Sequence, residues 1–113
     1  MSTTATLSNG TEIPLVGVGL WEVPADTAQK TVEDAVEIGY RHFDGAAAYK
    51  NEEGLGAGIR ACGVAREELF VTTKLQNANQ GYAKALKAFD ASLDRLGLDY
   101  VDLYLIHWPV PAW

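Results

Sequence analysis

Short apolar runs alternate along this chain with segments whose apolar residues recur at helical spacing. The short runs predict buried strands, and the periodic segments predict amphipathic helices. We expect strands over residues 15–19, 40–43, 69–73 and 101–106. The apolar faces of the three intervening helices are marked by Ala28, Val32, Ala35 and Val36, by Leu55, Ile59 and Cys62, and by Leu86, Phe89, Leu93 and Leu96.

Turn and capping residues set the ends of these elements. Asn9-Gly10 predicts a two-residue hairpin turn within residues 4–14, because both turn positions must tolerate positive φ. The sequence from Asp26 resembles a capping box at the start of the first helix. Two glycines follow helical segments where a left-handed residue is favoured, namely Gly39 and Gly97.

The second helix has an unfavourable composition. It carries Gly54, Gly56 and Gly58, and each glycine costs about 1 kcal/mol relative to alanine in a helix interior. We therefore expect close packing against this helix to compensate for the cost.

The predicted order is a hairpin at 4–14 followed by βαβαβαβ over 15–107, and no linker, repeat or charge block divides residues 1–113. Alternating strands and helices predict a single α/β unit with a parallel sheet. Four such strands fit either an open doubly wound sheet or half of a barrel, and periodicity does not separate the two.

Composition narrows the class of protein. The chain has 113 residues, 48% of them hydrophobic, and a formal net charge of −6. It has no run rich in Lys and Arg, so neither nucleic acid nor an anionic membrane is an expected partner. The single cysteine, Cys62, excludes an intrachain disulfide and fits a reducing compartment, which makes a cytoplasmic protein the expectation. Its place on an apolar helix face predicts an inert buried thiol.

Targeting and membrane signals are not found in the sequence. The N-terminus lacks the positive and apolar segments of a signal peptide. No apolar run approaches the roughly 18 residues that a membrane helix needs. We therefore expect a soluble protein.

Four polar residues fall at or just after the ends of predicted strands: Asp44, Tyr49, Lys74 and His107. Successive parallel strands in a strand–helix–strand chain all end on one face of the sheet. Groups that are far apart in the sequence can therefore meet there. The placement predicts one shared active site.

Other polar residues have structural interpretations. His42 lies inside a predicted strand and forms no convincing metal pair with His107, so no metal site is predicted. Glu52 and Glu53 lie in the first turn of a helix, where carboxylates offset the positive end of the helix dipole. Asp99 and Asp102 flank the last strand and are expected to be loop or edge charges.

Three blocks of the chain resemble the aldo-keto reductase family, in its bacterial 2,5-diketo-D-gluconate-reductase-like branch. The blocks are GYRHFDGAAAYKNEE at 39–53, VTTK at 71–74 and LIHWP at 105–109, and the resemblance runs from about Leu7 to Pro109. It implies the N-terminal half of a (β/α)₈ barrel, with four parallel strands and three helices preceded by a β-hairpin. It also implies reversible reduction of an aldehyde or ketone, such as a keto sugar or small carbonyl compound, by NADPH.

The resemblance assigns a catalytic role to each of the four residues. Tyr49 would be the general acid that protonates the carbonyl oxygen as hydride reaches the carbon. A free phenol has a pKa of about 10, and the neighbouring Lys74 ammonium would stabilise the phenolate. Asp44 would hold Lys74 in place and charged, and His107 would share a hydrogen bond that orients the carbonyl oxygen.

Further site residues are implied by the same resemblance. Gly19, Leu20 and Asp44 match positions near the nicotinamide end of the cofactor, whereas Trp21, Trp108 and His107 match positions around the substrate. The chain departs from the family pattern at two positions. Gly45 stands where a threonine or another small hydroxylic residue is usual, which loosens the backbone beside the aspartate, and Gln76 stands where relatives often carry tryptophan.

Length is the largest departure, because a complete barrel of this kind takes about 250 residues. A half barrel exposes two unpaired sheet edges. We therefore expect a fragment, a truncated gene product or an engineered half, or else two copies that pair to complete a barrel. The expected partners are a second copy or a missing C-terminal half, and the chain alone is expected to be weak or inactive. The alternatives are a non-catalytic half-barrel scaffold and a Schiff-base lyase acting through Lys74, although Tyr49 and the LIHWP block count against the lyase.

Overall fold

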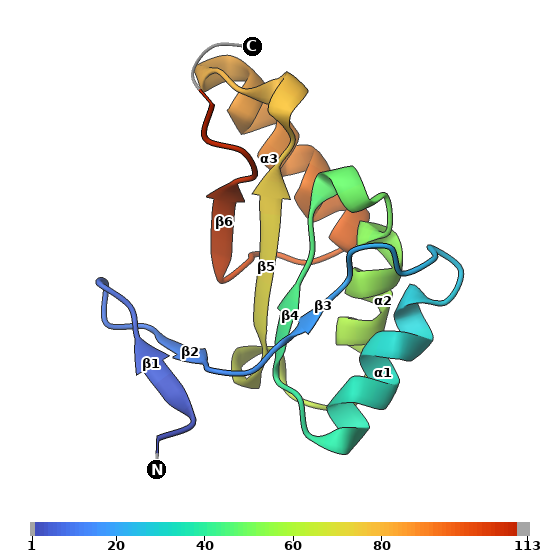
Figure 1. Cartoon of the computed structure of the whole chain (residues 1–113). Coiled ribbons are helices and arrows are strands. Elements are labelled where there is room, and N and C mark those ends of the chain that lie inside the picture. The colour runs from blue at the N-terminus through green and yellow to red at the C-terminus, as the bar shows by residue number, and fades with distance from the viewer. Residues whose placement is uncertain (1, 111–113) are drawn as a thin grey trace.

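The computed structural model describes residues 2–110 and has a four-stranded parallel sheet with three α-helices on one side and a separate two-stranded hairpin (Figure 1). Three short 3₁₀ helices, η1 to η3, lie in the connections. The bounds of the elements are β1 Thr4–Thr6, β2 Glu12–Pro14, β3 Val18–Gly19, α1 Ala28–Ile38, β4 His42–Asp44, η1 Ala47–Tyr49, α2 Glu52–Ala61, η2 Arg66–Glu68, β5 Phe70–Leu75, η3 Asn77–Asn79, α3 Tyr82–Leu96 and β6 Leu103–Ile106.

The strand order separates the two architectures that the sequence left open. The order is β3-β4-β5-β6, and every neighbouring pair is parallel. A doubly wound sheet reverses its strand order at a switch point and carries helices on both faces. Here the strands follow chain order and the helices share one side, which is the arrangement of part of a (β/α)₈ barrel.

The hairpin forms as predicted, but its turn differs. The N–H of Gly10 donates to the carbonyl of Leu7, and the N–H of Leu7 donates to the carbonyl of Thr11. Gly10 has φ 87°. Among the described residues, the non-glycine residues with positive φ are Glu22 and Lys50, and Asn9 is not one of them. The prediction that both Asn9 and Gly10 take positive φ is therefore wrong for Asn9.

Strand β3 is much shorter than predicted. Only Val18 and Gly19 pair with β4, and Leu15 and Val16 are 60% and 65% exposed. Within residues 2–110, β3 has a neighbour on one edge only, so nothing covers the residues that lead into it. The predicted buried strand over 15–19 is wrong at its start.

The start of α1 also differs from the prediction. Its N-cap is Thr27, and the side chain of Thr27 makes no capping bond to any residue the structure describes. The Thr27 hydroxyl donates instead to the Pro24 carbonyl, 3.2 Å away. The predicted capping box is therefore not formed. Gly39 ends the helix with φ 124°, as predicted, and donates to the carbonyls of Ala35 and Val36.

The glycines of α2 let its neighbours approach closely, as expected. A Cβ on Gly58 would lie 2.6 Å from Cβ of Val32 on α1, and a Cβ on Gly56 would lie 1.7 Å from the carbonyl oxygen of Leu96 at the end of α3. The core between sheet and helices includes Leu20, Val32, Phe43, Leu55, Val71 and Leu96. Close packing therefore offsets the poor helix propensity of α2.

The predicted apolar face of α3 is buried only at its C-terminal end. Leu96 is fully buried, whereas Leu86 is 56% exposed. Leu105 and Ile106 on the neighbouring strand β6 are 38% and 59% exposed. The interpretation of Leu86 as a core residue is therefore wrong, because α3 and β6 form an edge with no neighbour within residues 2–110. No helix among these residues is both long and apolar enough to cross a membrane.

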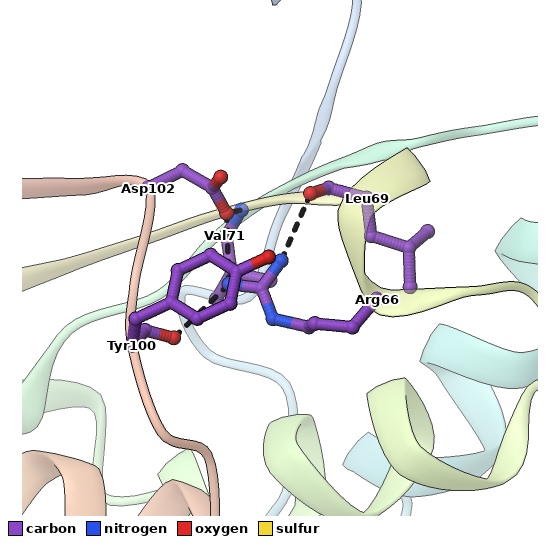
Figure 2. A network of polar contacts seen from close by, with 5 residues as sticks. All are labelled: Arg66, Leu69, Val71, Tyr100 and Asp102. Atoms are coloured by element: carbon purple, nitrogen blue, oxygen red, sulfur yellow. Dashed lines mark hydrogen bonds and ion pairs between the residues drawn. The ribbon is translucent and has the colours of Figure 1, made fainter.

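Asp102 lies in the loop before β6, as predicted, and its carboxylate also belongs to a polar network that was not foreseen (Figure 2). Its carboxylate accepts from the Val71 N–H and from the Arg66 guanidinium, each at 2.8 Å. Arg66 also donates to the carbonyls of Leu69 and Tyr100 and lies 4.1 Å from the centre of the Tyr100 ring. The network fastens the start of β6 to the start of β5, whereas Lys74 lies near the end of β5 and His107 directly follows β6.

Candidate active site

Three of the four predicted catalytic side chains meet around the Lys74 ammonium. Lys74 extends from β5, and its Nζ lies 2.8 Å from Oδ1 of Asp44 at the end of β4. The same nitrogen lies 3.3 Å from the hydroxyl of Tyr49 and 2.8 Å from the carbonyl oxygen of Gly45. The lysine side chain is 12% exposed and that of Asp44 is 40% exposed. The site is therefore half-sheltered at the carboxyl end of the sheet.

The loop after β4 carries Tyr49 back over the sheet. The N–H of Gly45 donates to the Thr72 carbonyl, so Gly45 extends the pairing of β4 with β5. Tyr49 ends the 3₁₀ helix η1, and Lys50 then turns the chain into α2 with φ 59°. Both backbone polar groups of Gly45 are bonded, so its position is fixed despite the loosening expected of glycine.

The hydrogen bonds define which protons the site can give. An ammonium has three donors, and Lys74 directs them to Asp44, Gly45 and Tyr49. The Tyr49 oxygen accepts one of these bonds, which leaves its own O–H free to donate elsewhere. A phenol that accepts from a cation and donates outward is arranged to act as a proton donor.

His107 completes the group from the end of β6. Its ring meets the Tyr49 ring edge to face, with centroids 5.6 Å apart and an interplanar angle of 82°. Burial, and after it the Lys74 ammonium, holds the pKa of His107 below its ordinary value, while Asp44 acts in the opposite direction. The imidazole is therefore neutral near pH 7, with one N–H donor and one acceptor nitrogen.

The other predicted site residues divide into exposed and buried groups. Trp21 and Trp108 are 67% and 57% exposed. Gly19 faces open space, since a Cβ there would have no neighbour within 4 Å among the described residues. Leu20 is fully buried in the core, its N–H bonded to Asp44 and its carbonyl to Asn51. The structure thus places Leu20 beneath the site and not in its lining. Gln76 lies exposed just past β5.

Sequence reasoning missed two buried residues that follow Tyr49. Asn51 is 2% exposed, and its side-chain amide donates to the carbonyls of Leu20 and Val23 at 2.8 and 2.9 Å. Glu52 is also 2% exposed and has several polar partners, so its interpretation as a carboxylate that offsets the helix dipole is incomplete. The available signal was Thr73, a polar residue on the face of the strand opposite Lys74.

His42 and Cys62 both have structural contacts. His42 Nδ1 lies 3.2 Å from the Pro14 carbonyl, and its ring packs edge to face on Phe70. Cys62 is half-buried, less than predicted, and its thiol donates to the Ile59 carbonyl. Within residues 2–110, no group of three His, Cys, Asp or Glu side chains is placed to hold a metal ion.

Comparison with known proteins gives a consistent result. The chain is 55% identical over 107 residues to the glyoxal reductase of Bacillus subtilis, covering 94% of this chain and 39% of that protein. The structure superposes on an aldo/keto reductase of Brucella melitensis with a TM-score of 0.94, at 53% identity and covering 98% of this chain and 43% of the other. It also superposes on a Bombyx mori aldo-keto reductase in complex with NADP, with a TM-score of 0.89, 44% identity and coverage of 95% and 38%.

These matches confirm the fold prediction of half an aldo-keto reductase barrel preceded by a hairpin, and the chain spans about 40% of the length of the curated relatives it matches. A sequence model described as "Aldo/keto reductase family" matches residues 6–113. The chain therefore belongs to the aldo/keto reductase family.

Proposed function

We propose that this chain carries the catalytic residues of an NADPH-dependent reductase that converts an aldehyde or ketone into an alcohol. The observation that carries the proposal is the bridge that Lys74 makes between Asp44 and the Tyr49 hydroxyl. That bridge supplies a proton donor and a fixed positive charge at one point. Both are needed where a carbonyl oxygen gains electron density.

The chain's own residues would complete the proton half of the reaction. Tyr49 donates its O–H to the carbonyl oxygen, and the Lys74 ammonium stabilises the phenolate that remains. Asp44 keeps the ammonium in place, and the neutral His107 ring donates a hydrogen bond that orients the oxygen. When bound, the nicotinamide cofactor supplies the hydride that the carbonyl carbon receives.

The exposed residues around Tyr49 fit the reacting end of such a cofactor and its substrate. Gly19 leaves space for close approach, and the Asp44 carboxylate is partly exposed beside it on the neighbouring strand. Trp21 and Trp108 offer apolar walls that can exclude water. The NADP complex of the Bombyx mori relative supports NADPH as the cofactor, and the name of the Bacillus subtilis relative supports small dicarbonyl compounds as substrates.

A Schiff-base lyase is disfavoured by the same geometry. A lysine nucleophile needs a neutral amine with a free lone pair. Lys74 instead donates three hydrogen bonds and is ion-paired with Asp44. The arrangement therefore suits a charge-stabilising lysine.

The test is NADPH oxidation by the purified 113-residue chain with glyoxal as the first substrate and NADH as the cofactor control. Tyr49→Phe should lower turnover by at least about 100-fold, the scale of a lost general acid, while NADPH fluorescence still titrates to saturation. Tyr82→Phe is the matched control, because Tyr82 is 87% exposed on α3. Turnover that survives in Tyr49→Phe would contradict the assigned role.

We propose further that the exposed edge formed by α3 and β6 is covered when the protein is active. Leu86, Leu105 and Ile106 present apolar surface there, and β6 has one strand neighbour within residues 2–110. Such an edge is a template for strand pairing. Light scattering on the pure chain distinguishes the occupants: a dimer means a second copy, and a soluble monomer without turnover means that a separate C-terminal half, or a scaffold role, is the better explanation.

A further inference from the structure

The carboxylate of Glu52 is buried behind the site, on the helix side of the sheet. Its side chain is 1% exposed. Oε2 accepts from the Thr73 hydroxyl at 2.6 Å, and Oε1 accepts from Arg95 Nε at 2.8 Å and from the Ser92 hydroxyl at 3.3 Å. We call these four residues the Glu52 network. A buried carboxylate is costly unless it is paired and hydrogen-bonded, and here its bonds connect the start of α2 to β5 through Thr73 and to α3 through Ser92 and Arg95.

The network joins the two segments that bear the proposed proton donor and its cation. Glu52 comes three residues after Tyr49, at the start of α2, and Thr73 directly precedes Lys74 on β5. Successive strand residues face opposite sides of a sheet. Thr73 therefore faces the helices, and Lys74 faces the other side of the sheet. The 2.6 Å bond between Glu52 and Thr73 fixes the distance between the Tyr49 loop and β5.

The charge of Glu52 also acts on β6, the strand directly before His107. Tyr104 lies three residues before His107 on β6, and its ring packs on Phe89 of α3 with centroids 4.9 Å apart. Burial and then the Glu52 charge raise the pKa of Tyr104, while Arg95 opposes them. Glu52 is thus close enough to act electrostatically on β6 as well as on β5.

On the opposite side, Asn51 fastens the same segment to the loop after β3. Its amide bonds to the carbonyls of Leu20 and Val23 leave the Tyr49 loop held between two anchors. These anchors position the contact between Lys74 and Tyr49. That contact is a long one, because 3.3 Å between Lys74 Nζ and the Tyr49 oxygen is near the limit of a hydrogen bond. A small displacement of either segment would break it.

We infer that Glu52 is a positioning residue: it holds the Tyr49 loop against β5 so that the Tyr49 hydroxyl stays within reach of Lys74. An effect of Glu52 on catalysis depends on the proposed function, and the inference rests on that function to this extent. It concerns a geometry that can be measured without substrate or cofactor. A chain that failed to reduce carbonyls would still reveal whether Glu52 sets this contact.

The experiment is an NMR titration of the two histidines, His42 and His107, in the 113-residue chain and in Glu52→Gln. Burial, and after it the Lys74 charge, keeps the pKa of His107 low, and the Tyr49 ring packs edge to face on the His107 ring. Loosening these contacts in Glu52→Gln should shift the His107 pKa upward and weaken the NOE between the His107 and Tyr49 rings. His42, which packs on Phe70 beside the hairpin, serves as the internal reference.

Two control variants separate positioning from general destabilisation. Glu53→Gln makes the same substitution at the exposed neighbour, and Asp102→Asn disturbs a comparable carboxylate–arginine network at the other end of the sheet (Figure 2). Both should leave the His107 pKa and the NOE at their unmodified values. The inference is overturned if Glu52→Gln also leaves them unchanged, or if either control shifts them as much.

A second pair of variants covers the case in which Glu52→Gln does not fold. Thr73→Val removes one donor and keeps the side-chain shape, while Thr73→Ser keeps the hydroxyl. In Thr73→Val, the His107 pKa should rise and the NOE between the His107 and Tyr49 rings should weaken. Thr73→Ser should restore both to their unmodified values. Equal spectra for the two variants would refute the positioning role.

Discussion

The electrostatics of His107 give a prediction in which two substitutions act with opposite signs. Lys74 lowers the pKa of His107 and Asp44 raises it, although burial is the largest cause of the net lowering. Lys74→Met removes a lowering contribution, so the His107 pKa should rise. Asp44→Asn removes the raising contribution, so the pKa should fall further. Each change keeps a side chain of similar size in place.

The expected size follows from the partial exposure of the groups. His107 is half-buried and the Asp44 side chain is 40% exposed, so solvent screens both couplings. Charge pairs of this kind interact by about 0.2–1 kcal/mol. Because these couplings are small, each variant should move the His107 pKa only modestly, upward for Lys74→Met and downward for Asp44→Asn. Because burial remains, Lys74→Met should not restore the ordinary value of about 6.5 completely.

The assay is the chemical shift of the imidazole Cε1 proton followed between about pH 4 and 9. The chain has only two histidines, so the signals are assigned by comparison with a His42→Gln variant. The reasoning is refuted if both substitutions shift the His107 pKa in the same direction. It is also refuted if the His42 pKa moves as much as that of His107, since the effect would then be global.

Three further predictions concern stability. Gly56→Ala should lower the urea midpoint although alanine gains about 1 kcal/mol of helix propensity, because its Cβ would meet the Leu96 carbonyl oxygen at 1.7 Å; a higher midpoint would contradict the packing argument. Asp102→Asn should cost about 1–3 kcal/mol in urea unfolding, since it replaces a charged acceptor of Arg66; a variant as stable as the parent would count against the network. His107 binds a proton more weakly folded than unfolded, so its contribution to stability should fall as the pH drops below about 6.5; His107→Gln should flatten that part of the profile.

The meeting of Asp44, Lys74 and His107 was predictable because it depends only on strand polarity. Each residue lies at the carboxyl end of a strand, and three parallel neighbours bring those ends together. Tyr49 is different, because it reaches Lys74 through the loop that follows β4. Its place shortly after a predicted strand suggested that it belongs to the site, but periodicity carries no information about the path of that loop, so its role as proton donor came from the family resemblance.

The errors at the sheet edges have a common physical cause. Leu15, Val16 and Leu86 are apolar and were expected to be buried, yet each is more than half exposed. An apolar pattern indicates which residues form an apolar face, but it does not indicate which element packs against that face. At β3 and β6, no further strand lies alongside within residues 2–110. The pattern was therefore correct about the chemistry of the edge and wrong about its burial.

Glu52 was missed for another reason, and that reason bears on how the site is built. Strand β5 points Lys74 toward Asp44 and Tyr49 and points Thr73 toward Glu52 on the helix side. One strand therefore connects the two sides of the sheet. Ser92 and Arg95 lie on α3, across the sheet from Tyr49, yet they hold the carboxylate that fixes the Tyr49 loop. Substitutions on that helix should therefore alter the contact between Tyr49 and Lys74 without touching either residue.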